Sequence, residues 1–128
     1  EYYKNFLSTQ ISKKMICTNP DLIVDRGNTR EYCAGSIAKL FEEIDGEVIY
    51  FGKPYPPVYE LAANIKNKKI LCIGDNLNTD IKGAMTQNFD SLLITGGIHR
   101  QEILKFSIDN VLKNYDAKIN YFQSELKW

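Results

Sequence analysis

Short apolar runs alternate with helix-like segments along most of this sequence of 128 residues. The runs are rich in branched and aromatic residues and too short for buried helices, which predicts strands at 48–51, 70–73, 91–95 and 119–122. Apolar residues recur at helical spacing in the segments between them, which predicts helices at 35–46, 56–65, 79–87 and 101–115, the last with a break near 107. Strands that alternate with helices form right-handed βαβ units. The sequence therefore predicts an α/β fold with a Rossmann-like parallel sheet and flanking helices.

Composition narrows the class of protein. Sixteen basic residues balance 16 acidic ones, and 44% of the chain is hydrophobic, which suits one soluble domain or part of a larger one. Without a basic surplus, nucleic acid is not expected as the main partner. No apolar run is long enough to span a membrane, and three widely spaced cysteines in apolar contexts favour a reducing cytoplasm.

The remaining segments carry weaker signals. Residues 1–14 are compatible with a helix, and 15–17 form an apolar run that stops at a turn. Residues 22–32 are polar and irregular. The helix at 56–65 is expected to bury Val58, Leu61, Ala62 and Ile65, and the basic stretch 66–69 is expected to be a solvated turn.

Charged residues follow two of the predicted strands. Lys53 comes after the strand at 48–51, and Asp75 and Asp80 come after the strand at 70–73. If these strands are adjacent and parallel, their carboxyl ends lie at one edge of the sheet, where ligands bind in such folds. A lysine that faces two acids beside a metal is a recurrent arrangement for phosphoryl groups. The alternative is that the acids cap a helix and the lysine lies on the surface.

Three segments in this order resemble the haloacid dehalogenase (HAD) superfamily: YFGKPYPPVYELA, ILCIGDNLNTDIKGAM and LLITGGIHRQEI. The resemblance is closest to class IIA, whose phosphatases act on nucleotides, pyridoxal phosphate, phosphoglycolate or nitrophenyl phosphate. The GKP lysine and the GDNxxTD acids are similar to the third and fourth motifs of that superfamily. CTNPD at 17–21 and AGSIAKLFEEIDGE resemble the class IIA segment that closes the cap and returns to the core, so the match covers about residues 15–100.

The resemblance implies roles for individual residues. Asp75 would ligate Mg²⁺, and Asp80 would ligate it or hold its water. Lys53 would bind the phosphoryl group and the carboxylate of the nucleophile. Asn76 and Thr79 would fix the carboxylate rotamers by hydrogen bonds. The implied domains are a C-terminal remnant of the class IIA cap at 1–47 and the C-terminal half of the HAD core at 48–128.

Three further residues have a weaker claim to function. Asn19 and Asp21 either act at the boundary between cap and core or form an Asx-type turn at the end of a strand. His99 is the only histidine and follows Gly96-Gly97. As a lone loop residue, it is expected to be structural or on the surface rather than an acid or base.

The first two motifs of the superfamily are missing from this sequence. These enzymes use a DxDGT-like aspartate as the nucleophile, but the chain holds no DxD, and LIVDRGNT at 22–29 lacks the second aspartate. The chain also opens on Glu1 rather than methionine. The sequence therefore predicts the C-terminal portion of such a phosphatase, inactive alone. Its expected partners are a small phosphorylated metabolite and the missing N-terminal half, in the same or a second chain. A shortened chain, a split gene and a remnant reused for binding all remain open.

Two rivals stand beside the leading interpretation. The leading one is a Mg²⁺-dependent phosphatase that, when complete, hydrolyses a small phosphomonoester through an aspartyl-phosphate. The first rival is a non-enzymatic Rossmann-like module that binds or assembles with a partner through an exposed sheet edge. The second is a receiver-like signalling domain, which lacks the expected acidic pair early in the chain.

Overall fold

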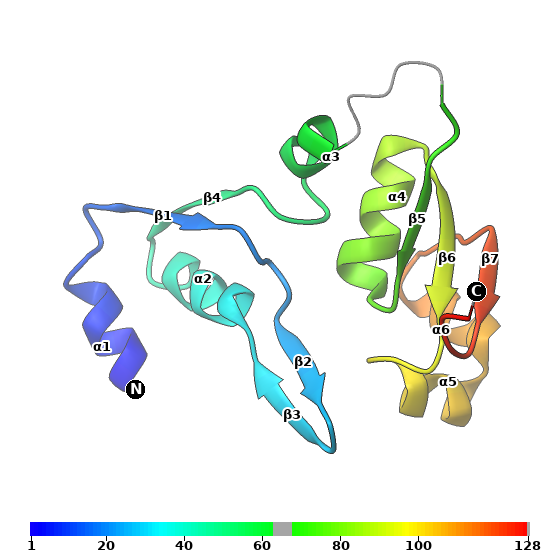
Figure 1. Cartoon of the computed structure of the whole chain (residues 1–128). Helices are drawn as coiled ribbons and strands as arrows, with labels where there is room; N and C mark the ends of the chain where they lie inside the picture. The colour runs from blue at the N-terminus through cyan, green and yellow to red at the C-terminus, as the bar shows by residue number, and fades with distance from the viewer. Residues whose placement is uncertain (63–67, 128) are drawn as a thin grey trace.

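The computed structural model describes residues 1–62 and 68–127 (Figure 1). Its strands fall into two parallel sheets and one hairpin. The first sheet pairs β1 (Lys14–Cys17) with β4 (Glu47–Tyr50), and the hairpin pairs β2 (Ile23–Arg26) with β3 (Thr29–Tyr32). The second sheet has the order β5 (Leu71–Gly74), β6 (Asp90–Ile94), β7 (Tyr121–Gln123).

Helices and turns connect these strands. They are α1 (Tyr2–Ser8), α2 (Ala34–Glu42), α3 (Pro56–Ala62), the π-helical turn η1 (Leu77–Ile81), α4 (Lys82–Gln87), α5 (Arg100–Phe106) and α6 (Ile108–Asn114). Every helix of the described ranges is too short or too polar to cross a membrane. The α/β class with parallel strands is confirmed.

The two sheets are not joined by backbone pairing within the described residues. β4 lies at the edge of its own sheet and β5 lies at the edge of the other, so these two strands are not paired with each other. Parallel pairing is nevertheless found inside each sheet, as in Met15↔Val48 and Ile73↔Leu92. Because β1 and β4 are partners, the chain on both sides of position 47 contributes to one sheet. The domain boundary at residue 47 stays a prediction.

Each sheet has its own small core. Beside the three-stranded sheet, a fully buried cluster joins η1 to β6 and α6 through Leu77, Ile81, Leu93 and Val111. On the N-terminal side, the buried apolar residues come from α1, β1 and α2: Leu7, Cys17, Ala38 and Phe41. Both cores bury residues of helices against parallel strands, which is how α/β folds are built.

Some local predictions were wrong. Residues 22–32 contain the β2–β3 hairpin, whose two-residue turn places Gly27 at φ +61°, a conformation open to glycine at no steric cost. Leu61, expected to be buried, is 87% exposed because α3 contacts α4 through other side chains, including Tyr59, whose hydroxyl lies against Gly83. Ile65 and the turn residues 66 and 67 lie outside the described residues.

Other local predictions were confirmed. Helix α3 begins at Pro56, as expected of a proline at a helix start. The break near 107 separates α5 from α6 at Ser107, which has φ +68°. The described cysteines are unpaired thiols, with Cys17 buried and Cys33 and Cys72 half-buried.

Candidate functional site

The acidic loop, defined as residues 74–81, begins where β5 ends. Gly74 closes the strand, and Asp75 follows it before the chain enters η1. The side chain of Asn76 accepts a hydrogen bond from the N–H of Asn78 (2.9 Å), and the N–H of Asn76 donates to Asp80 Oδ2 (3.1 Å). These bonds satisfy groups that a helical start leaves without internal partners. The loop thereby holds Asp80 inward, where it is buried.

Lys53 reaches this loop from the other sheet. It lies after β4, and its ammonium group donates to Asp80 Oδ1 in an ion pair. Burial lowers the pKa of Lys53, but the hydrogen bond to Asp80 and the charges of Asp80, Asp21 and Asp75 outweigh it, so this pKa lies above its usual value. Lys53 is therefore a cation held among three carboxylates.

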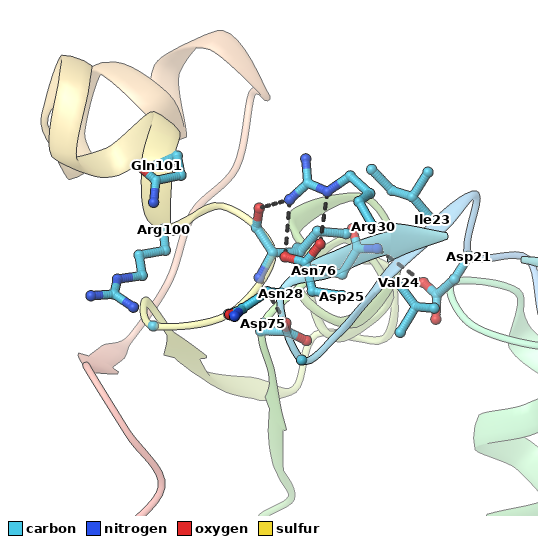
Figure 2. Close-up of a pocket in the computed structure, with 14 residues that line it drawn as sticks. Asp21, Ile23, Val24, Asp25, Asn28, Arg30, Asp75, Asn76, Arg100 and Gln101 are labelled. Carbon is cyan, nitrogen blue, oxygen red and sulfur yellow. Dashed lines mark hydrogen bonds and ion pairs between the residues drawn. The ribbon is translucent and has the colours of Figure 1, made fainter. Parts of the chain in front are cut away.

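Asp21 ties a third loop to the same place. Its Oδ1 accepts hydrogen bonds from Asn76 Nδ2 (3.0 Å) and Thr79 Oγ1 (2.6 Å). Both donors lie more than fifty residues after Asp21 in the sequence. Figure 2 shows Asp21 pointing toward Asn76 across this junction. Asn19 instead accepts from the N–H of Asp21 (3.2 Å), which is an Asx-type turn at the end of β1.

The loop that follows β6 supports Asp75. The N–H of Ile98 donates to Asp75 Oδ2 (2.9 Å). The carbonyl of Ile98 accepts from the guanidinium of Arg30 (3.0 Å), which also pairs with Asp25 across the hairpin (2.8 and 3.0 Å) (Figure 2). Arg30 lowers the pKa of the Asp25 carboxyl by donating these bonds. The β2–β3 hairpin is thus connected through Ile98 to the carboxylate of Asp75.

Two glycines keep this site compact. A Cβ at position 74 would overlap the carboxylate of Asp80, and a Cβ at position 97 would overlap that of Asp75. Any other residue would force these carboxylates to move. The absence of side chains at Gly74 and Gly97 therefore allows both acids to lie against the backbone.

A cavity of about 620 Å³ opens beside the acidic loop, between the hairpin and the start of α5 (Figure 2). Asp75 and Asn76 lie on one side of it, and Arg30 and Arg100 are among its walls. A smaller cavity of about 300 Å³ lies next to it, with His99 and Thr79 among its lining residues. A small polar ligand would have carboxylate, amide and guanidinium groups within reach here.

The donor chemistry fits a hard divalent cation in part. Asp75 uses Oδ2 for the Ile98 N–H, and Oδ1 accepts no hydrogen bond from the described residues. Asp80 has one oxygen on Lys53 and the other on a backbone N–H. Within residues 1–62 and 68–127, no three His, Cys, Asp or Glu side chains form a candidate metal cluster. Carboxylate oxygens suit Mg²⁺, with Asp75 the better placed ligand of the two.

The structure brings together most of the residues singled out from the sequence. One connected set of hydrogen bonds joins five of them: Lys53, Asp80, Asn76, Thr79 and Asp21. Sequence reasoning missed the connection from Arg30 through Ile98 to Asp75. The Gly96-Gly97 pair after a strand was the available signal, because it marks the same edge of the sheet as Asp75.

Comparisons with known proteins point to one family of hydrolases. A family model described as HAD-hydrolase-like matches residues 50–117, more than half of the chain. Dihydroxyacetone phosphatase of Corynebacterium glutamicum (strain R) is 32% identical over 89 residues, which cover 66% of this chain and 32% of that protein. Ribonucleotide monophosphatase NagD of Escherichia coli (strain K12) is 29% identical over 89 residues, with 66% and 34% covered.

A solved structure shows the same fold at greater coverage. The crystal structure of a haloacid dehalogenase-like hydrolase from Brucella suis 1330 matches 93% of this chain and 44% of its own, with 30% identity and a TM-score of 0.71. The chain spans about a third of the length of the curated relatives it matches.

Proposed function

The chain belongs to the HAD-hydrolase-like family, and we propose that it is the C-terminal portion of a class IIA phosphatase. The complete protein would hydrolyse a small phosphomonoester with Mg²⁺ as its cofactor. The observation that carries this proposal is the ion pair between Lys53 and Asp80, which joins the loop after β4 to the acidic loop. Both of the relatives named above are phosphatases, which supports it.

The residues of this chain have distinct proposed roles. Lys53 would neutralise phosphoryl oxygens as negative charge develops on them. Asp75 would be a direct ligand of Mg²⁺, and Asp80, already engaged with Lys53, would orient that lysine and a metal-bound water. Asn76 and Thr79 would hold Asp21 against the acidic loop through their hydrogen bonds to its carboxylate. The cation, when bound, offsets phosphoryl charge and orients the group for attack.

The nucleophile is proposed to come from sequence outside these 128 residues. In an aspartyl-phosphate mechanism, a carboxylate oxygen attacks phosphorus, and the bond from phosphorus to the alcohol oxygen breaks as a second carboxyl group gives that oxygen its proton. Water then attacks phosphorus, gives its proton to that second carboxylate, and releases phosphate and the original carboxylate. The chain holds no DxD, and each of the three carboxylates near Lys53 already accepts a hydrogen bond: Asp80 from Lys53, Asp75 from a backbone N–H, and Asp21 from the side chains of Asn76 and Thr79. The 128-residue chain alone is therefore proposed to be inactive.

The proposed macromolecular partner is the N-terminal half of the enzyme, in the same or a second chain. Apolar side chains of both sheets are left exposed: Ile16 and Ile49 in one, Leu71 and Ile73 in the other. β4 and β5 are both edge strands of the described fold. Added strands between them would pair their free backbone groups and cover these side chains. The same feature would serve a non-enzymatic assembly module, which is the second candidate.

The proposed ligand is a small phosphorylated metabolite. The cavity of about 620 Å³ beside Asp75 has room for one, and its polar walls suit an anionic or hydroxylated leaving group. A cytoplasmic location, expected from the cysteines, is part of the same proposal.

Hydrolysis of nitrophenyl phosphate tests the proposed function. Three proteins are compared: the 128-residue chain, the complete protein from its initiator methionine, and the complete protein with its nucleophilic aspartate changed to Asn. We expect Mg²⁺-dependent turnover from the complete protein only. Robust turnover by the 128-residue chain would overturn the proposal and direct attention to Asp21 and Asp25. A folded complete protein without phosphatase activity would favour the assembly module.

Asp75→Asn in the complete protein tests the metal site. We expect a sharp rise in the Mg²⁺ concentration needed for half-maximal activity and an unchanged fold, because a strand-end carboxylate contributes little to core packing. The Mg²⁺ titration is run beside a circular dichroism spectrum. An unchanged Mg²⁺ requirement would remove Asp75 from the site.

A further inference from the structure

We propose that His99 is a positioning residue of this site, whose neutral imidazole holds the first peptide N–H of η1. The N–H of Leu77 donates to His99 Nε2 (3.2 Å). Both residues are buried, with His99 7% and Leu77 2% exposed. The turn that starts at Leu77 carries Thr79 and Asp80.

The partners of His99 determine its protonation. Because Nε2 accepts a hydrogen bond from a backbone N–H, it carries no proton of its own. The remaining proton is therefore on Nδ1, which faces Glu102 Oε2 at 3.2 Å. Tyr115 donates its hydroxyl to the same oxygen (3.2 Å), and its ring lies edge-on to the imidazole at 4.8 Å. Glu102 and Tyr115 thus hold the ring in the one orientation that presents a lone pair to Leu77.

The Leu77 N–H has no other acceptor among the described residues. It belongs to the start of a helical turn, where N–H groups have no partner within the turn, and the Asn76 side chain serves the N–H of Asn78 instead. A buried N–H without an acceptor costs free energy. His99 therefore stabilises the geometry in which η1 begins directly after Asp75 and Asn76.

His99 and its neighbour Ile98 act on two ends of one loop. Ile98 holds Asp75 through its N–H, and His99 holds Leu77 through its ring. The loop after β6 thereby fixes the separation between Asp75 and the turn that presents Asp80. The importance of this separation for phosphoryl transfer rests on the function proposed above. The hydrogen bond between His99 and Leu77 is independent of that function.

A pair of variants of similar size tests the positioning. In His99→Gln, the side-chain carbonyl can accept from the Leu77 N–H, whereas in His99→Met no comparable acceptor remains; both lose the imidazole and its contact with Tyr115. In the 128-residue chain, we expect the Leu77 amide to exchange with solvent at least about tenfold faster in His99→Met than in His99→Gln. Equal exchange in the two variants would overturn the proposal.

A spectroscopic measurement needs no variant. The imidazole ¹⁵N shifts of the unaltered chain at neutral pH are expected to show an unprotonated Nε2 and a protonated Nδ1. The opposite tautomer, or a doubly protonated ring, would overturn the proposal. This measurement decides the question even if His99→Met fails to fold.

The consequence for the reaction is measured in the complete protein. We expect His99→Met to lower kcat by about tenfold with little change in KM and His99→Gln to recover most of it, because a misplaced acidic loop affects the transition state more than ground-state binding. Equal kcat in both variants would overturn the role in catalysis. A further outcome separates the two proposals. If the unaltered complete protein hydrolyses no phosphomonoester but the Leu77 amide still exchanges faster in His99→Met than in His99→Gln, the proposed function is wrong and the role of His99 in positioning Leu77 is supported.

Discussion

The acidic loop (residues 74–81) and the lysine loop (residues 51–55) meet at one site but are supported very differently. Leu77 and Ile81 of the acidic loop belong to a fully buried cluster, and backbone groups bind its carboxylates. In the lysine loop, Phe51 and Tyr55 are exposed, and the side chain of Lys53 is 44% exposed against 8% for that of Asp80.

The difference separates two ways of placing a functional group. Asp75 and Asp80 are placed by the packing of the three-stranded sheet, so their position depends on the core. The ammonium group of Lys53 is instead held by its ion pair with Asp80, across a boundary that no sheet pairing crosses among the described residues. Removing core atoms should therefore affect folding, whereas removing the lysine charge should affect chemistry.

The largest expected effect comes from Ile81→Ala. Ile81, the last residue of the acidic loop, is fully buried, and truncation of such a side chain costs about 2–5 kcal/mol of unfolding free energy through lost burial and a residual cavity. Leu61→Ala is the control, because Leu61 is 87% exposed and its loss should change stability by less than about 0.5 kcal/mol. Urea unfolding followed by circular dichroism measures both. Equal losses would contradict the view that the core supports the acidic loop.

Lys53→Ala should lower the turnover of the complete protein by about a hundredfold, the usual cost of losing one electrostatic contact to the transition state. Its effect on melting temperature should be smaller than that of Ile81→Ala, because Asp80 keeps the hydrogen bond from Asn76. Lys82→Ala, at an exposed position in α4, is the control. If Lys53→Ala lowered the melting temperature strongly but left the activity per folded molecule unchanged, Lys53 would serve the stability of the fold and not the reaction. The proposed difference between the two loops would then be wrong.

The smallest effect on stability is expected from a variant at the contact between α3, which follows the lysine loop, and α4, which follows the acidic loop. Tyr59 of α3 lies edge-on to Phe89, and its buried hydroxyl has no partner among the described residues. Tyr59→Phe should therefore leave the unfolding free energy unchanged or raise it by up to about 1 kcal/mol.

The same variant has a pH signature. Burial raises the pKa of Tyr59 to about 12 from an ordinary value of 10, so the folded state resists ionisation that the unfolded chain undergoes. The stability that this group contributes is complete below pH 10 and is lost as pH rises toward 12. Tyr59→Phe should lose less stability over that interval than the unaltered chain, with Tyr2→Phe, at an exposed position, as the control. Parallel pH curves would contradict a buried, unpaired hydroxyl.

The strands and the site loops were largely predictable from the sequence. β5 and β6 lie close to their expected positions because short branched runs between glycines and polar residues have few other stable arrangements. Lys53 and Asp75 were recognisable for the same reason, since each follows such a run. The β2–β3 hairpin was missed because most of its residues are polar and it has no regular alternation of apolar and polar residues, and the cross-strand pair of Asp25 and Arg30 has no periodic signature.

The sequence by itself determined which residue types lie at the strand ends, because the position of a strand end depends on the spacing of apolar residues and on turn residues within a few positions of it. Only the tertiary structure decided which of them meet. Lys53 joins Asp80 across 27 residues, Asp21 joins Thr79 across 58, and His99 joins Leu77 across 22. Such contacts depend on how helices pack and where loops cross, and that free energy is shared among many residues rather than written into any short segment.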